Sequence, residues 1–326
     1  MSEKTKIICM DDIQSKDVDW LWYPYIPYGK VTIVQGDPGE GKTSFALALI
    51  ALLTTGKPLP EQERGGEPVS VIYQTAEDGL ADTIKPRLES YGADCKKVLV
   101  IDDTDVGLTL SDKRLEEAIG ETGARLVVLD PIQAYLGSDV DMHRANEVRS
   151  VFKRLCTMAE KTGCAVVLIG HMNKDARGKA LYRGLGSIDF SAAVRSILVV
   201  GRAKDDKTMR IIAHSKSNLA PEGQSLAFEL SENCSFHWKG YCDVTVDALL
   251  SGTGSVQTKT VQMENELREL LVKPMMAYQV YEHAKTLDIS ERTVKTAKKN
   301  VGVVSTLVGG RWQWSLPKSG TESVRV

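Results

Sequence analysis

Apolar residues in the first half of the chain form short runs, separated by longer segments of helical character. The first run, residues 31–35, is rich in β-branched residues, and residues 44–53 soon after it contain no proline or glycine and predict a helix. Similar runs of strand length lie at residues 69–74, 98–101, 126–129 and 164–170. Helices are predicted between them at residues 78–91, 111–122 and 147–162, with Ser111 as the cap of the second. This alternation predicts an α/β fold with a mostly parallel central sheet.

The pattern changes after residue 195. Residues 196–201 and 209–213 predict a hairpin, and residues 226–230 and 236–238 can extend the same sheet. We therefore expect the first domain to cover residues 1–245. Within it, the aromatic and proline-containing residues 20–28 cannot form a regular helix. They either cover the edge of the sheet or stack on a bound base.

The hydrophobic pattern restarts near the C-terminus. Residues 251–262 are rich in Ser, Thr and Gly, and we place a linker at residues 246–262. Three helical segments follow, at residues 264–272, 277–287 and 290–300, and then two strands that flank Gly309-Gly310, a hairpin signal. Three helices and a hairpin predict a winged helix-turn-helix domain at residues 263–318, with a disordered tail at residues 319–326.

Composition excludes some classes of protein. The 326 residues carry a formal net charge of −2, so any nucleic-acid surface must be local. The six cysteines are scattered without a C-x-x-C pair, which argues against a disulfide framework or a zinc site. Because no apolar run has the length of a signal peptide or membrane span, we expect a soluble, cytoplasmic protein without a membrane partner.

The turn after the first predicted strand contains a nucleotide-binding motif. Residues 36–43 read G-D-P-G-E-G-K-T, which fits the P-loop pattern G-x-x-x-x-G-K-[ST] between a strand and a helix. Glycines let backbone N–H groups turn toward a triphosphate, and the helix N-terminus adds a favourable dipole. Lys42 is expected to reach the β- and γ-phosphates, and Thr43 to bind Mg²⁺. The predicted ATP-binding residues are Gly36, Asp37, Pro38, Gly39, Glu40, Gly41, Lys42, Thr43 and Ser44.

Three polar residues follow strands at the same predicted sheet edge. Glu77, after the second strand, is a candidate general base for an attacking water, although it could also cap the next helix. Asp130 ends an apolar run in the Walker B pattern and is expected to hold Mg²⁺. His171 could touch the γ-phosphate or be a satisfied histidine near the sheet edge.

Two groups of cations are candidates for nucleic-acid contact. The first lies on a glycine-rich loop, which could grip a phosphate backbone or be an ordinary solvated loop: Lys174, Arg177, Lys179 and Arg183. The second lies on the last helix and the hairpin of the predicted winged helix: Arg292, Lys295, Lys298, Lys299 and Arg311. A basic recognition helix suggests contact with duplex DNA, and protein docking is the alternative.

The order of P-loop, strand-tip Glu, Walker B Asp and strand-tip His-x-x-Lys resembles the core of the RecA superfamily. Residues 20–27 (W-L-W-Y-P-Y-I-P) and 76–78 (A-E-D) narrow the resemblance to RepA-type plasmid helicases and to RadA- and DnaB-like ATPases of phages and mobile elements. It spans about residues 10–240 and implies a RecA-like P-loop NTPase core. It also implies that Glu77 activates water, Asp130 holds Mg²⁺ and His171 senses the γ-phosphate.

The resemblance further implies a cation that reaches into a neighbouring subunit's ATP site. Lys216 matches that position, with His214 two residues before it and Arg202 as a substitute. Many hexameric helicases carry arginine there, and lysine lacks its bidentate geometry.

These features together predict an oligomeric DNA-dependent ATPase, in the form of a hexameric ring. Such a protein would use ATP and Mg²⁺ to act on single-stranded DNA, as a helicase, in the replication or recombination of a mobile element. The alternative is an ATP-controlled DNA-binding regulator or initiator without helicase activity. A small-molecule kinase is disfavoured by Glu77 at the position of a base and by the appended C-terminal domain.

Overall fold

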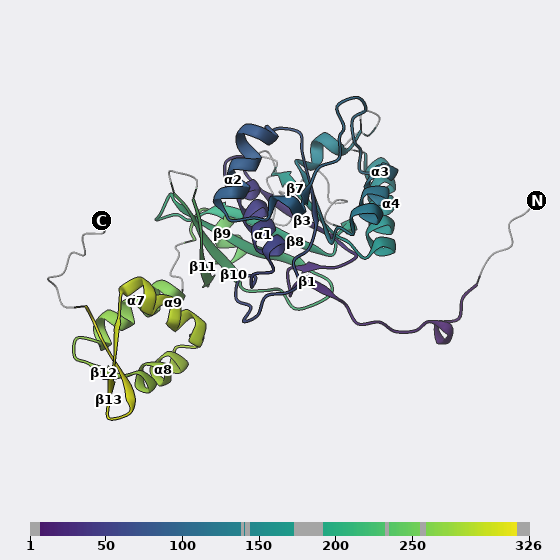
Figure 1. The fold of residues 1–326 in the computed structure, drawn as a ribbon. Coiled ribbons are helices and arrows are strands. Elements are labelled where there is room, and N and C mark those ends of the chain that lie inside the picture. The colour runs from purple at the N-terminus through teal and green to yellow at the C-terminus, as the bar shows by residue number, and fades with distance from the viewer. Residues whose placement is uncertain are drawn as a thin grey trace, which may run out of the picture.

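The core of the protein is one nine-stranded sheet covered by helices (Figure 1). The computed structural model describes residues 7–137, 140, 144–172, 192–231, 235–254 and 259–317. The strand order is β11-β10-β9-β8-β3-β7-β6-β4-β5. The strands are β3 (Val31–Gly36), β4 (Val71–Thr75), β5 (Val98–Leu99), β6 (Leu126–Asp130), β7 (Ala165–His171), β8 (Ser196–Arg202), β9 (Met209–Ser217), β10 (Ser225–Leu230) and β11 (Phe236–Cys242).

The sheet has a parallel part and an antiparallel part. Neighbouring strands from β8 across to β5 pair in parallel, and β8, β9, β10 and β11 pair antiparallel. The fold is therefore α/β with a mostly parallel central sheet, as the sequence predicts. The hairpin predicted after residue 195 is β8–β9.

Helices cover both faces of the parallel strands (Figure 1). One layer contains α1 (Lys42–Thr55) and α2 (Lys85–Ser90), and the other contains α3 (Lys113–Thr122) and α4 (Ala145–Thr162). Alternate residues of β3 face opposite layers: Val34 packs with the α1 layer, whereas Val31 and Ile33 pack with the α3–α4 layer. Burial on both faces explains why the parallel strands read as continuous apolar runs. The remaining short elements before the C-terminal unit are η1 (Met10–Asp12), β1 (Trp20–Trp22), β2 (Ile26–Pro27), η2 (Leu80–Ile84), η3 (Cys95–Lys97), η4 (Ile132–Tyr135) and α6 (Val246–Leu250).

Some predicted boundaries are wrong for local reasons. The helix predicted at residues 78–91 is a π-helical turn, η2, followed by the shorter α2. The cap of α3 is Asp112, whose carboxylate accepts from the Arg114 N–H, rather than Ser111. The predicted strand at 98–101 ends at Leu99, because the Gln74 side chain bonds both backbone groups of Ile101 at 2.8 and 3.0 Å.

The aromatic segment at residues 20–28 packs over α1. Trp22 is fully buried, with ring centroids 4.4 Å from Tyr25 and 6.2 Å from both Phe45 and Trp238. Packing within the core therefore occupies Trp22 and Tyr25, which favours the covering role over stacking on a base.

The C-terminal unit, residues 259–317, has its own core. Its elements are α7 (Lys259–Leu270), β12 (Met275–Met276), α8 (Ala277–Thr286), α9 (Glu291–Val301), β13 (Val304–Val308) and β14 (Arg311–Ser315), with the strand order β12-β14-β13. Met263, Leu267, Val294 and Trp314 are among its buried residues. The Ser290 hydroxyl caps α9 by accepting from the Thr293 N–H. Two boundaries differ from expectation, because α6 lies inside the predicted linker and α7 begins at residue 259.

No helix in the described part of the chain is both long enough and apolar enough to cross a membrane.

His214 is buried at the centre of β9, with 3% of its surface exposed. Its Nδ1 accepts from the Gly223 N–H at 2.9 Å, so Nε2 carries the proton and lies 3.0 Å from Ser196 Oγ. The Ser196 hydroxyl in turn donates to the Tyr25 carbonyl at 2.6 Å. Burial lowers the pKa of His214 to about 4.

We expect His214 to make the fold sensitive to acid. Below about pH 6.5 the unfolded chain takes up a proton that the folded chain binds only near pH 4, so stability falls as the pH drops through this window. Between about pH 7 and about pH 5 the loss is about 2 kcal/mol. His214→Gln keeps one acceptor and one donor but does not titrate. Urea unfolding at both pH values should therefore show a smaller loss in the variant, and equal losses would contradict the assignment.

Candidate active site

The P-loop joins β3 to α1, and both its backbone angles and its close packing require glycine at several positions. Gly39 and Gly41 have φ of +78° and +90°, in the left-handed region that favours glycine. A Cβ on Gly36 would lie 2.1 Å from the Val200 carbonyl oxygen of β8, and one on Gly41 would lie 2.8 Å from Leu230 Cδ1 of β10. The loop is therefore pressed against β8 and β10, two of the four strands that continue the sheet beyond β3.

Lys42 is buried at the centre of this loop, with 4% of its surface exposed. Its Nζ donates to the carbonyls of Gly36 and Asp37, both at 2.8 Å, and lies 3.3 Å from His171 Nδ1. These three contacts use all three N–H donors of an ammonium group. Burial lowers the pKa of Lys42, and nearby carboxylates, Asp130 first, oppose this effect. Phosphate oxygens entering the loop would be alternative acceptors for the same donors.

His171 lies between Lys42 and Glu77. Because Nδ1 accepts from Lys42, the His171 proton is assigned to Nε2, which lies 3.8 Å from Glu77 Oε2. The Glu77 side chain is 64% exposed and follows the end of β4, while His171 is the last residue of β7. The structure thus brings together three residues that the sequence placed on separate elements.

Thr43 and Asp130 form the other half of the site. The Thr43 hydroxyl donates to Asp130 Oδ2 at 2.7 Å, and the Tyr73 hydroxyl donates to the same oxygen at 3.1 Å. Asp130 is only 6% exposed, and burial raises its pKa, while the two hydroxyls and Lys42 act in the opposite direction. Sequence reasoning missed Tyr73. The alternation along β4, which puts Val71, Tyr73 and Thr75 on one face, is the signal that could have found it.

The residues beside the P-loop fit Mg²⁺. This cation prefers one or two carboxylates together with phosphate and water oxygens. A hydroxyl has one proton and two lone pairs, so Thr43 can donate to Asp130 and still offer its oxygen to a cation. In the described ranges, no group of three or more His, Cys, Asp or Glu side chains could hold a metal unaided. A metal shared between these two residues and a bound phosphate matches that donor set.

The three candidates for a subunit interface lie in different surroundings. Arg202 Nη2 donates to the carbonyl of Gly39 at 3.4 Å and lies 3.6 Å from Glu40 Oε1, so Arg202 contacts the P-loop of its own chain. Lys216 Nζ donates to the Val194 carbonyl at 3.0 Å and is half-buried. His214 is buried with both ring nitrogens bonded inside its own chain, so its surroundings are those of a packing residue.

Several of the predicted DNA-binding residues in the described part of the chain already have protein partners. Lys174, Arg177, Lys179 and Arg183 lie outside the described residues. On α9, Arg292 donates to the Gln62 carbonyl of the core. Lys298 bonds Ser305 Oγ at 2.6 Å and lies 4.4 Å from the Trp314 ring centroid. Arg292, Lys295, Lys299 and Arg311 are exposed, and Lys295 lies 3.9 Å from Glu291.

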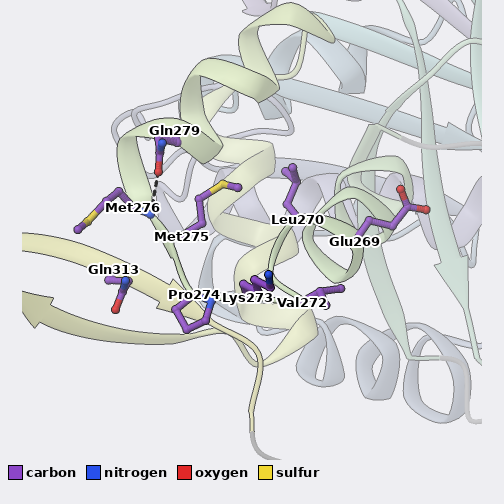
Figure 2. A pocket seen from close by; sticks show the side chains of 9 residues that line it. All are labelled: Glu269, Leu270, Val272, Lys273, Pro274, Met275, Met276, Gln279 and Gln313. Atoms are coloured by element: carbon purple, nitrogen blue, oxygen red, sulfur yellow. Dashed lines mark hydrogen bonds between the residues drawn. The ribbon is translucent and has the colours of Figure 1, made fainter.

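A hollow of about 480 Å³ in the C-terminal unit contains none of these candidates (Figure 2). In it the Met276 N–H donates to Gln279 Oε1 at 3.2 Å. It is lined by Glu269, Leu270, Val272, Lys273, Pro274, Met275, Met276, Gln279 and Gln313. It therefore has no part in the arrangement around Lys42.

Comparison with known proteins adds a family and several relatives. A family model described as "AAA domain" matches residues 10–177, just over half of the chain. The DNA repair protein RadA of Halalkalibacterium halodurans is 26% identical over 227 residues, which cover 68% of this chain and 44% of that protein. RadA of Bacillus subtilis is 27% identical over 149 residues, covering 45% and 29%. The chain thus spans less than half the length of these curated relatives. The crystal structure of a KaiC-like protein from Pyrococcus horikoshii is 19% identical, with a TM-score of 0.48, and the match covers 65% of this chain and 90% of that one.

The approach of Gly36 to β8 leads to a test of the P-loop's shape. Gly36→Ala would place a methyl carbon 2.1 Å from a backbone oxygen, which must move the loop or the strand. We expect a loss of about 1–3 kcal/mol in unfolding free energy, together with weaker nucleotide binding. Gly66→Ala is the matched control, because no atom lies within 4 Å of the added carbon. Urea unfolding and fluorescent-nucleotide titration of both variants would check this, and equal behaviour would contradict it.

Proposed function

The chain belongs to the AAA domain family, and we propose that it is a RecA-type P-loop ATPase that couples ATP hydrolysis to action on single-stranded DNA. The role that we favour for the protein is that of a helicase of the RepA type, in the replication or recombination of a mobile element. One observation carries the proposal: Lys42, His171 and Glu77 form a continuous chain of contacts beside the Thr43–Asp130 pair. That arrangement contains the parts needed for hydrolysis of a phosphoanhydride.

Hydrolysis assigns each residue a separate task. The P-loop N–H groups and Lys42 bind the phosphates, and Thr43 and Asp130 would hold Mg²⁺, which neutralises phosphate charge when bound. Glu77 accepts a proton from water while the water oxygen bonds to the γ-phosphorus. The bond from that phosphorus to the bridging oxygen breaks, and ADP leaves with the electron pair. The exposure of Glu77 leaves room for the water beside it.

His171 is proposed to report the state of the nucleotide. In the described arrangement its Nδ1 accepts from Lys42 and its Nε2 faces Glu77. When Lys42 turns to a phosphate, Nδ1 loses that donor, so the orientation of His171 depends on the nucleotide. β7 ends at His171, and the chain continues into the predicted DNA-binding loop. A change at the phosphate can therefore be passed along the chain to Lys174, Arg177, Lys179 and Arg183.

Support for DNA as the polymer comes from two sources. The curated relatives are named as DNA repair proteins, and the predicted basic loop follows directly from the sensing residue. In the proposed hexameric ring, Lys216 near the end of β9 supplies charge to the ATP site of a neighbour, and Arg202 steadies its own P-loop.

A second candidate is an ATP-controlled DNA-binding regulator or initiator, in which the C-terminal unit is a winged helix that reads duplex DNA. Two contacts with the core bear on this candidate, because they give α9 a docked state that ATP could control. Arg292, in the first turn of α9, donates to the Gln62 carbonyl, and the Thr260 hydroxyl of α7 donates to the Lys239 carbonyl at 2.9 Å. Because the first residues of a recognition helix are those that reach base edges, reading DNA would require α9 to leave the core.

Replacing the proposed base tests the hydrolysis mechanism. Glu77→Gln removes the proton acceptor but keeps the shape, so we expect kcat to fall by about 10²–10⁴-fold with nucleotide affinity retained. Asp78→Asn is the matched control, because Asp78 lies 3.6 Å from Arg87 and has no assigned role in the site. A steady-state ATPase assay and a nucleotide titration would check both. Unchanged turnover in Glu77→Gln would contradict the assignment of Glu77 as the general base.

The two candidate functions differ in their response to salt. If the four loop cations track a single strand, the logarithm of single-strand affinity should fall with the logarithm of salt concentration with a slope of about −3. Replacing Lys295, Lys299 and Arg311 together by alanine should then leave single-strand stimulation of the ATPase unchanged. Under the regulator hypothesis, the same variant loses duplex binding, and single-stranded DNA does not stimulate wild-type turnover at low salt.

A further inference from the structure

Tyr73 is buried without exposure and makes one side-chain hydrogen bond, to Asp130. Its hydroxyl donates to Oδ2 at 3.1 Å, the same oxygen that accepts from Thr43 at 2.7 Å. In the described part of the chain, the other carboxylate oxygen, Oδ1, has no hydrogen-bond partner. One oxygen of Asp130 is therefore held from two sides, by β4 and by the start of α1.

The register of the sheet explains how Tyr73 reaches Asp130. In the parallel pairing of β4 with β6, Tyr73 lies opposite Val128 and Thr75 lies opposite Asp130. Side chains two residues apart share a face of a strand, so Tyr73, Val128 and Asp130 all face the layer that contains α1. The length of a phenol spans the two-residue step along the neighbouring strand. A shorter hydroxyl at this position would not reach the carboxylate.

The two hydrogen bonds to Asp130 Oδ2 fix the orientation of the Thr43 hydroxyl. The Thr43 proton is directed at Asp130, so the remaining lone pairs of its oxygen are the ones available to a cation beside the P-loop. With Thr43 as its sole anchor, the Asp130 carboxylate could rotate about its side-chain bonds and carry the Thr43 hydroxyl with it. The Tyr73 phenol removes that freedom.

We propose that Tyr73 is a positioning residue for the Mg²⁺–nucleotide complex, acting through Asp130 on the Thr43 hydroxyl. The inference rests on the proposed function of this site. Side chains that orient metal ligands typically contribute 10- to 100-fold to metal affinity. Tyr73 therefore contributes to nucleotide binding only when Mg²⁺ is present, whereas a purely structural tyrosine would affect binding equally with and without the metal.

The test compares two tyrosines that differ in their hydrogen bonding. Tyr73→Phe removes only the hydroxyl and keeps the buried ring. Tyr135→Phe is the matched control, because Tyr135 is 2% exposed, lies in η4 just after Asp130, and has a buried hydroxyl without a partner in the described structure. For each protein, the Kd of a fluorescent ATP analogue is measured with saturating Mg²⁺ and with EDTA. Binding of Mn²⁺ in the presence of ADP, followed by electron paramagnetic resonance, gives a second readout independent of turnover.

We expect Tyr73→Phe to lose about 10-fold or more of the gain in affinity that Mg²⁺ gives, with the Kd in EDTA unchanged and Mn²⁺ binding weakened. Tyr135→Phe should match wild type in all three measurements. An unchanged Mg²⁺ gain in Tyr73→Phe, or an equal loss with and without metal, would overturn the role of Tyr73 and leave the ATPase proposal standing. A wild-type protein that gains no affinity from Mg²⁺ would instead overturn the proposed site and this inference together.

Discussion

A buried ammonium group must have acceptors for all of its protons, and this requirement at Lys42 organises the site. Two acceptors are the P-loop carbonyls of Gly36 and Asp37, and the left-handed backbone angles of Gly39 and Gly41 allow the rest of the loop to turn back to Lys42. The third is His171 at the end of β7, which ties the loop to the strand that leads toward the predicted DNA-binding loop. The Lys42 contacts thus give the nucleotide site a direct connection to the rest of the sheet.

The parallel arrangement of the strands makes this connection possible. β4, β6 and β7 end at the same edge of the sheet, so Glu77, Asp130 and His171 meet although they are far apart in the chain. Burial on both faces keeps these strands in a single register, because a slip of one residue would exchange the two core layers. The same register brings Tyr73 to Asp130. Precision at the site therefore derives from the packing of residues such as Val34 and Ile33, which touch no substrate.

The sequence was enough to predict those features that depend only on residues adjacent in the chain. The P-loop, the apolar run before Asp130 and the alternation of strands and helices could be read from neighbouring residues, and the α/β fold with its mostly parallel sheet followed from them. Tyr73 was missed because its role depends on a partner 57 positions away in the sequence. Arg202 was expected at a neighbour's site, but β8 lies beside β3, so the end of β8 reaches the P-loop of the same chain. Where two polar residues compete for one backbone group, as Ser111 and Asp112 do at the start of α3, side-chain geometry decides.

The C-terminal unit illustrates a different limit, because the charge of a side chain does not reveal its partner. The cations of α9 suggest a DNA-reading surface, yet Arg292 faces the core and Lys298 lies over Trp314. Both contacts satisfy charges that a DNA-bound helix would offer to phosphates or bases. Docking on the core and reading of a duplex therefore use overlapping groups, and the two states exclude each other at Arg292. The core residue that receives this contact, Gln62, lies in the loop after α1, the helix that begins at Lys42. A movement of α1 on nucleotide binding would therefore displace the surface to which α9 docks.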